Sequence, residues 1–218
     1  MRKEEIAYLY NHYCKHGHRF IEHPKCISQL GQNNPLCEKL GFLDIETTGL
    51  KGTYAYVLSY CIKEDNGKIL GRHLTKREIH SETYDKNLLK ELINDMRKFD
   101  KLVTYYGGDY RFDLPILRTR ALYWGLDFPL YKEIKGVDLY SIVKKKFNLH
   151  SNKLGVVCDF FGIQAKGHPM NPRVWFGANA GNERNLEWVF THNKEDVCST
   201  EKLYHKIFEY DSPKNSSI

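Results

Sequence analysis

The stretch GFLDIETTG, residues 41–49, decides the fold class of this protein. Its first half is apolar and is followed by charged residues, a pattern that predicts a buried strand over residues 40–45. Side chains two apart in a strand share one face, so Asp44 and Glu46 would lie side by side. Adjacent carboxylates repel each other unless a cation lies between them, and Mg²⁺ prefers such oxygen ligands. The alternative interpretation is a strand end that emerges into solvent.

Strand and helix patterns alternate outward from this stretch. Residues 65–67 read Asp-Asn-Gly, a hairpin turn signal. Further strands are predicted over residues 54–62, 68–74, 101–106 and 137–139, and helices over 85–99, 114–123, 140–147, 153–160 and 185–208. A hairpin meander followed by alternating helices and strands predicts an α/β fold with a mixed β-sheet flanked by helices.

A second acidic residue follows a pair of glycines. Gly107 and Gly108 let the chain turn sharply after the strand predicted over residues 101–106, and Asp113 stands just before the helix that begins at Leu114. A carboxylate in that position would cap the helix. Asp109 could fill the same role, so capping by itself does not single out Asp113.

A third polar element lies on the long final helix. His192 and Asp196 are four residues apart, which places them on one face of that helix. On an exposed helix such a pair is only a weak surface contact, which is the alternative interpretation. Val197 belongs to the apolar stripe of the helix, so the neighbouring Asp196 is expected near the buried side.

In this order, the three segments resemble the motifs of the DEDD superfamily of 3′–5′ exonucleases, which have a ribonuclease H-like fold. The motif residues are Asp44-x-Glu46 followed by Thr-Thr-Gly, then Phe112-Asp113, then His192-x-x-x-Asp196. Residues 114–117 and 137–140 are similar to exonucleases of the YprB type and to the proofreading domain of family B DNA polymerases. The chain departs from the family at Tyr106, where the second motif carries Asn, and at His192, which stands at the spacing of a Tyr.

The resemblance implies a metal-dependent 3′–5′ exonuclease with a two-metal-ion mechanism. The motif acids would bind two divalent cations, Mg²⁺ or Mn²⁺, and His192 would orient or deprotonate the attacking water. The implied metal ligands are Asp44, Glu46, Asp113 and Asp196, and the implied substrate-binding residues are Thr47, Thr48, Phe112 and Lys153.

Two other functions are weighed against this one. The same site could serve a structure-specific endonuclease or an RNA-processing nuclease. The chain could also be a non-catalytic nucleic-acid-binding module with a decayed site, although its four acids are intact. The partner in each case is nucleic acid, with DNA favoured over RNA, and no membrane is implied.

The first forty residues differ in composition from the rest. Cysteine and histidine alternate there at short intervals, and Zn²⁺ takes four such ligands. The best set is Cys14, His18, His23 and Cys26, although its spacing matches no standard finger template. The alternative is packing cysteines with phosphate-facing histidines. The predicted organisation is an N-terminal extension over residues 1–39 that could contain a zinc-binding element, the ribonuclease H-like exonuclease domain over 40–211, and a flexible tail over 212–218.

Composition sets the broad class. The chain has 218 residues, 41% hydrophobic and 28% charged, which excludes a disordered protein and a coiled coil. It has no apolar run of about 20 residues and no signal-peptide pattern, so a cytoplasmic location in a bacterium or a phage-infected cell is expected. The net charge of +6 permits a polyanionic partner without requiring one.

Overall fold

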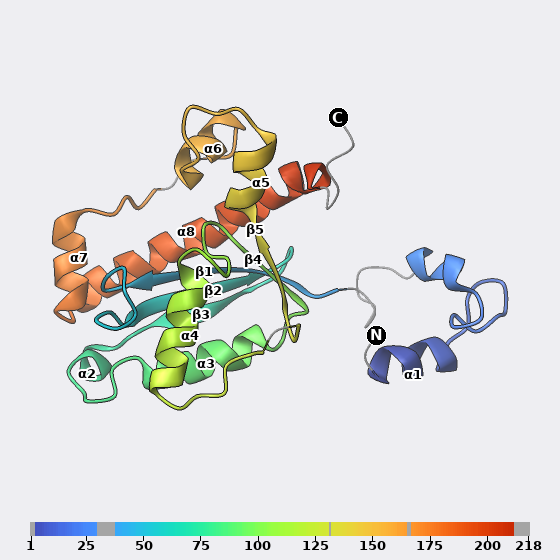
Figure 1. Ribbon diagram of the computed structural model, residues 1–218, viewed down its shortest axis with the longest axis horizontal. Helices are drawn as coiled ribbons and strands as arrows, with labels where there is room; N and C mark the ends of the chain where they lie inside the picture. Colours follow the sequence, from blue (N-terminus) through green and yellow to red (C-terminus); the bar gives the residue numbers. More distant parts are fainter. Residues whose placement is uncertain (1–2, 30–37, 131, 165–166, 212–218) are drawn as a thin grey trace. The chain divides into compact units, whose positions relative to one another are not determined.

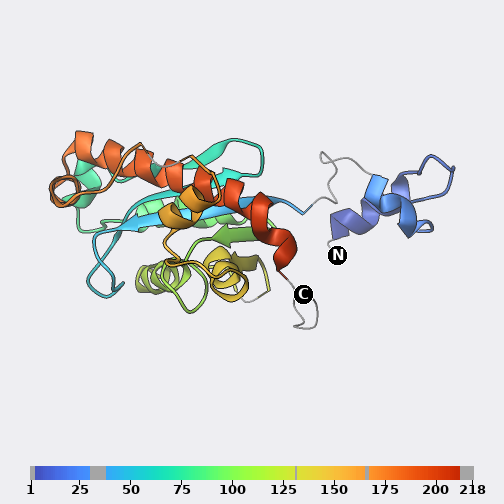
Figure 2. The ribbon, with the colours of Figure 1, turned by 90° about the horizontal axis from the view of Figure 1, so that it is seen from above.

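The computed structural model describes residues 3–29, 38–130, 132–164 and 167–211. The chain forms two compact units, Met1–Lys39 and Leu40–Ile218. Figures 1 and 2 show a sheet with helices around it in the second unit. The tail expected at residues 212–218 lies outside the described residues. Within the described ranges, no helix is long and apolar enough to cross a bilayer.

A five-stranded mixed sheet forms the centre of the second unit. Its strands are β1 (Leu40–Thr47), β2 (Val57–Glu64), β3 (Ile69–His73), β4 (Lys101–Thr104) and β5 (Lys135–Asp138). They lie in the order β3-β2-β1-β4-β5; β2 is antiparallel to both β1 and β3, and β4 and β5 run parallel to β1. This topology confirms the predicted fold class. It also brings the C-terminal ends of β1, β4 and β5 together, where α/β proteins place their sites.

The helices of this unit include two that the sequence patterns did not predict. In chain order they are α2 (Lys76–Ile79), α3 (Lys86–Met96), α4 (Asp113–Tyr123), α5 (Leu139–Lys146), α6 (Leu154–Phe160), α7 (Pro172–Asn179), α8 (Glu183–Ile207) and the 3-10 helix η2 (Phe208–Tyr210). The unpredicted ones are α2 and α7. The strand expected over residues 54–62 begins only at Val57, because Tyr54 and Ala55 donate to the Lys51 carbonyl in a turn.

Alternate side chains of β1 enter two apolar clusters on opposite faces of the sheet. Phe42 packs against α8, with its ring 5.5 Å from that of Tyr204. Leu43 joins the cluster that contains the side chains of α3 and α4. Figure 1 shows α8 running along the sheet, apart from α3 and α4. The period of two therefore directs Asp44 and Glu46 toward α8.

A buried ion pair ties β2, α3 and α4 together. The carboxylate of Asp85, which is fully buried, accepts from Arg120 Nη2 at 2.7 Å and from Arg120 Nε at 3.0 Å. It also accepts from Trp124 Nε1 at 2.7 Å and from the backbone N–H of Val57 at 3.0 Å. Arg120 therefore has a structural role in this domain.

We expect Asp85→Ala to lower the free energy of unfolding by about 3–5 kcal/mol, because it leaves Arg120 buried without its counter-charge. Urea denaturation of the full chain, followed by circular dichroism, measures the change. The matched control is Asp127→Ala, whose side chain is 86% exposed in its pair with Arg97; it should cost less than about 1 kcal/mol. Equal losses in the two variants would contradict the prediction.

The first unit is small. It contains helix α1 (Lys3–Asn11), an isolated antiparallel bridge between Tyr13 and Arg19, and the 3-10 helix η1 (Pro24–Gln29). Its buried apolar cluster consists of Leu9, Cys14, Phe20 and Cys26, with Ile27 packed against it.

Candidate active site

Strand β1 presents its two acids next to an irregularity. Opposite Glu46 lies Ser59, but opposite Thr47 lies Val57, so one residue of β2 bulges at this point. A β-bulge bends the strands and re-aims neighbouring side chains, and bulges are common beside active sites. Here it follows directly on Glu46, at the end of β1 where the other acids gather.

Helix α8 brings three polar side chains to these acids. Asn193 Nδ2 donates to Asp44 Oδ2 at 2.5 Å. His192 Nε2 lies 3.8 Å from Glu46 Oε1 and 3.7 Å from Asp196 Oδ2. Asp196 is only 9% exposed, so the histidine–aspartate pair is not the surface contact of the alternative interpretation. Ligand atoms of Glu46, His192 and Asp196 lie within 4.8 Å of one another, close enough to share a metal ion.

Asp113 enters the site from the start of α4. At Gly107 an added Cβ would collide with Asp113 Oδ2, so the turn needs glycine because the carboxylate lies against the backbone. The expected capping role of Asp113 is wrong. Helix α4 begins at Asp113 itself, and the N-cap residue, Phe112, makes no side-chain cap bond.

The surroundings of Asp113 fit a cation. Burial raises the pKa of Asp113 well above its ordinary value, and the negative charges of Glu46, Asp138 and Asp196 raise it further. Asp113 Oδ2 is buried and has no hydrogen-bond partner among the described residues. A hard divalent cation would satisfy this oxygen and offset the repulsion between the carboxylates. The residues present therefore fit Mg²⁺ or Mn²⁺.

We expect Asp113→Asn to raise the unfolding temperature in EDTA, because the variant removes a buried charge from this cluster. Mn²⁺ should stabilise the unsubstituted chain by about 2.7 kcal/mol at a hundred times its Kd, roughly 5–10 °C, and the variant by clearly less. Thermal unfolding across a Mn²⁺ titration checks both. Asp159→Asn, at an exposed position on α6, is the control and should behave as the unsubstituted chain. Identical Mn²⁺ responses in all three would argue against a metal at Asp113.

The imidazole of His192 has a defined tautomer. Its Nδ1 lies 2.7 Å from the carbonyl oxygen of His168. A carbonyl can only accept, so Nδ1 carries the proton. Nε2 is then the nitrogen that faces Glu46 and Asp196, where it can exchange a proton with a molecule in the site.

The carbonyl that orients His192 is itself anchored. Glu195 accepts from the His168 backbone N–H at 3.1 Å, and its other oxygen lies 2.6 Å from His168 Nδ1. Burial raises the pKa of Glu195, but the hydrogen bonds from His168 outweigh this and lower it. Trp188 adds a bond from its indole N–H to the Pro169 carbonyl at 3.3 Å. Helix α8 thus holds the segment that fixes the ring of its own His192.

Asp138 closes the site at the end of β5. Its Oδ1 accepts from the backbone N–H of Tyr106 at 2.9 Å, and its Oδ2 accepts from the Ser141 hydroxyl at 3.1 Å. Tyr106 has a φ of 65°. This left-handed conformation costs a residue other than glycine about 1–2 kcal/mol, and Asn tolerates it best. The Asn of the resembling motif is thus the residue that this backbone favours, and Tyr106 retains a strained conformation of the kind that clusters at functional sites.

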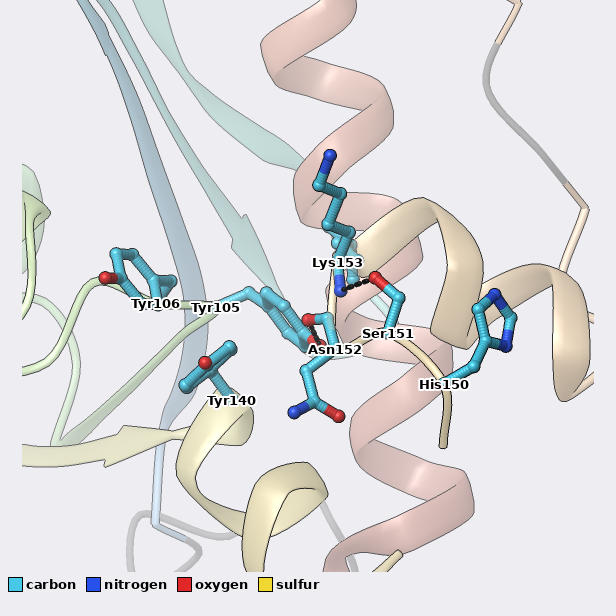
Figure 3. A pocket seen from close by; sticks show the side chains of 8 residues that line it. Tyr105, Tyr106, Tyr140, His150, Ser151, Asn152 and Lys153 are labelled. Atoms are coloured by element: carbon cyan, nitrogen blue, oxygen red, sulfur yellow. Dashed lines mark hydrogen bonds between the residues drawn. The ribbon is translucent and has the colours of Figure 1, made fainter. Parts of the chain in front are cut away.

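A hollow of about 560 Å³ opens beside Tyr106 (Figure 3). It is lined by Tyr105, Tyr106, Tyr140 and residues 150–154. The Arg111 guanidinium lies 5.3 Å from the ring centre of Tyr106 and 4.9 Å from that of Tyr140. Lys153, one of the predicted substrate residues, is exposed and lines this hollow. Aromatic rings beside cationic groups are what unstacked bases bind.

The other predicted substrate residues are more enclosed. Thr47 is buried and its hydroxyl donates to the Gly49 carbonyl at 2.7 Å. Thr48 exchanges hydrogen bonds with Tyr56 through its backbone N–H and its hydroxyl, each at 3.0 Å. Phe112 is half-buried against the core. Through these hydrogen bonds, Thr47 and Thr48 stabilise the turn after β1. That they also contact a substrate stays a prediction.

Asn193 and Asp138 belong to the site but were not among its predicted residues. Asn193 falls four residues after Val189 and four before Val197, on the buried stripe of α8, and is itself fully buried. A polar residue in an apolar stripe was the signal that could have identified it. Asp138 carries the weaker signal of an acid at the end of a parallel strand.

The family to which the chain belongs is shown by a match over most of the second unit. A family model described as RNase_H superfamily matches residues 41–208. The chain belongs to the RNase H superfamily. The matched range contains the four acids and His192, whereas Cys14 and Cys26 precede it. Membership of the RNase H superfamily, together with the arrangement of these acids, identifies the second unit as a nuclease-type domain.

Two proteins that are similar to this member of the RNase H superfamily are DNA polymerases. A DNA polymerase of Methanocaldococcus jannaschii is 28% identical over 166 residues, which cover 66% of this chain and 10% of that protein. The structure of the family B DNA polymerase from the hyperthermophilic archaeon Pyrobaculum calidifontis matches with a TM-score of 0.64 and 17% identity, over 82% of this chain and 25% of that one. The chain therefore spans only a small part of either polymerase. The family match over residues 41–208 confirms the ribonuclease H-like prediction.

Proposed function

We propose that this protein is a metal-dependent 3′–5′ exonuclease that hydrolyses nucleic-acid phosphodiesters by a two-metal-ion mechanism. The observation that supports this best is the convergence of acids from three elements. Asp44 and Glu46 come from β1, Asp113 from the start of α4 and Asp196 from α8, and Asp113 is buried among the other charges. Such a cluster is unfavourable without cations and is suited to phosphoryl chemistry with them.

The metal ligands in this proposal are the four acids. Glu46 and Asp196 share one side of the site with His192, and Asp113 offers an oxygen with no hydrogen-bond partner in the described part of the chain. Divalent cations, when bound, neutralise the phosphate, align the attacking water and stabilise the leaving oxygen. Asn193, through its bond to Asp44 Oδ2, fixes the orientation of that carboxylate.

His192 acts on the attacking water in this proposal. The bond from its Nδ1 to the His168 carbonyl holds Nε2 toward the acids. A neutral imidazole in that tautomer can take a proton from water through Nε2. The anchored segment at His168 keeps the ring from rotating, so that the geometry is set before substrate arrives.

The substrate in this proposal is single-stranded nucleic acid, with DNA preferred. The hollow lined by Tyr105, Tyr106 and Tyr140 offers aromatic faces, and Lys153 and Arg111 offer positive charge beside them. Rings of this kind stack on any base, and the cations contact phosphates, so recognition would be indifferent to sequence.

The test is digestion of end-labelled oligonucleotides of DNA and RNA with and without Mn²⁺. We expect 5′-labelled single strands to shorten stepwise and 3′-labelled strands to release labelled mononucleotide at once. Circular single strands should survive. Cleavage of circles would favour an endonuclease, and binding that persists in EDTA without any cleavage in Mn²⁺ would favour a non-catalytic module.

A further inference from the structure

The first unit contains a compact group of soft and borderline ligands outside the active site. The sulfur atoms of Cys14 and Cys26 and one ring nitrogen each of His16 and His23 all lie within 4.8 Å of one another. Both cysteines are buried, and neither is in a disulfide. Nothing in the proposed nuclease mechanism uses these side chains.

The distances in this group match a tetrahedral metal centre. Cys14 Sγ lies 3.8 Å from His16 Nδ1 and 3.5 Å from His23 Nδ1. Cys26 Sγ lies 3.2 Å from His16 Nδ1 and 3.5 Å from His23 Nδ1. A tetrahedral zinc ion with Zn–S of about 2.3 Å and Zn–N of about 2.0–2.1 Å would hold sulfur and nitrogen about 3.5 Å apart.

Hydrogen bonding alone does not account for these contacts. Each sulfur contacts two ring nitrogens, and each ring nitrogen contacts two sulfurs. Each Nδ1 has either one proton or one lone pair, so it forms one linear hydrogen bond as donor or acceptor, and the two rings can account for only two of the four contacts. A cation at the centre accounts for all of them together.

Two tight turns present the ligands. The backbone N–H groups of Cys14 and Gly17 donate to the carbonyls of His18 and Cys14, at 2.8 and 2.9 Å. Gly17 adopts a φ of 77°, which favours glycine. On the other side, the Cys26 N–H donates to the His23 carbonyl at 3.0 Å in the turn that opens η1. Each turn therefore brings one cysteine and one histidine to the same point.

These turns correct the ligand set expected from the sequence. The reversal at Gly17 pairs His18 with Cys14 through the backbone and leaves the His18 ring outside the group, edge-on to His23 at 5.2 Å. His16, at the tip of the turn, takes its place. Spacing alone could not distinguish the two histidines, because the direction of each ring depends on the backbone angles of the turn.

The first unit also needs a source of stability. Leu9 and Phe20 are its only fully apolar buried side chains in the described part, and the remaining two members of its cluster are the cysteines themselves. A unit of about 40 residues rarely folds on so small a core without a metal or disulfides. Structural zinc supplies this stability directly, because the free energy of binding becomes free energy of folding.

We propose that Cys14, His16, His23 and Cys26 bind one structural Zn²⁺ that holds residues 8–27 in their fold. Two sulfur and two nitrogen ligands in a tetrahedron select Zn²⁺ over the hard cations of the active site. The protein supplies all four ligands, so no position is open for catalysis.

The test is the zinc content of the full chain purified under reducing conditions, measured by mass spectrometry of the metal. We expect about one zinc per chain, and near zero in His16→Ala and Cys26→Ser. His18→Ala is the matched control and should retain its zinc, because its ring lies outside the ligand set. Replacement by Co²⁺ should give the charge-transfer absorption of a thiolate–cobalt centre in the unsubstituted chain and in His18→Ala alone.

Other outcomes would overturn the proposal. A chain that contains no zinc and takes up none when Zn²⁺ is added would exclude the site. Loss of zinc from His18→Ala but not from His16→Ala would show that the ligand set is wrong. Carboxylates can also bind zinc, so the zinc content of Asp44→Asn is measured as well. Loss of zinc from this variant would show that the zinc binds at the active site and not at the cysteines and histidines.

Discussion

Asp44→Asn is expected to lower Mn²⁺-dependent hydrolysis of a single-stranded oligonucleotide by about 10³-fold or more, with the fold unchanged. The metal ions of such a site contribute several kcal/mol to the transition state, and each 1.36 kcal/mol is about tenfold in rate. The variant removes the negative charge of one of the four proposed metal ligands. Its amide oxygen can still accept from Asn193, so the packing of β1 against α8 is retained. Initial rates at saturating Mn²⁺ measure the loss.

The control for this prediction is Asp109→Asn. Asp109 follows the same pair of glycines, but its side chain is 54% exposed and pairs with Arg118. Its substitution should change the rate by less than about twofold, because exposed ion pairs contribute little. Asp196→Asn should reproduce the loss seen for Asp44→Asn. Full activity in either acid variant would exclude the proposed metal site.

His192→Ala is expected to cost roughly 10²–10⁴-fold in kcat, the usual contribution of a general base. The loss should persist at saturating Mn²⁺ if Nε2 acts on the water. The ligand atoms of His192, Glu46 and Asp196 are also close enough to share one metal ion. If Nε2 binds that ion, the Mn²⁺ concentration that gives half-maximal activity should be higher in His192→Ala. Rates measured across a Mn²⁺ titration separate these two roles.

The matched control is His205→Ala, a second histidine of α8 that pairs with Asp65 at 2.7 Å and is 45% exposed. It should leave kcat within about twofold of the unsubstituted chain. A loss below threefold in His192→Ala would show that the ring has only a structural role. A loss of similar size in both variants would point to damage to α8 in general.

Local patterns accounted for most of the fold and for the acidic residues. The alternation in β1 predicted that Asp44 and Glu46 share a face, and the stripe of α8 predicted that Asp196 lies near the buried side. Each of these predictions concerns a single element. The side chains of a strand repeat about every two residues and those of a helix about every 3.6, so the pattern can be read directly from the sequence. The helix α2 was missed because its four residues are too short a window for periodicity.

Contacts between distant residues were not predictable in the same way. Asn193 and Asp44 are 149 positions apart and meet only because α8 crosses the face of β1. The tautomer of His192 depends on the carbonyl of His168, which α8 itself anchors through Glu195. Neither contact has a local pattern, since each depends on how one element packs against another.

The sequence by itself therefore determined the fold class, the acids and the region rich in cysteine and histidine, because residue type and spacing specify strands, helices and ligand chemistry. Only the tertiary structure decided which atoms meet. It replaced His18 by His16 through the turn at Gly17, and it put Asp113 inside the acid cluster and not at a helix cap. The physical reason is that the direction of a side chain depends on backbone angles and packing, which spacing along the chain does not contain.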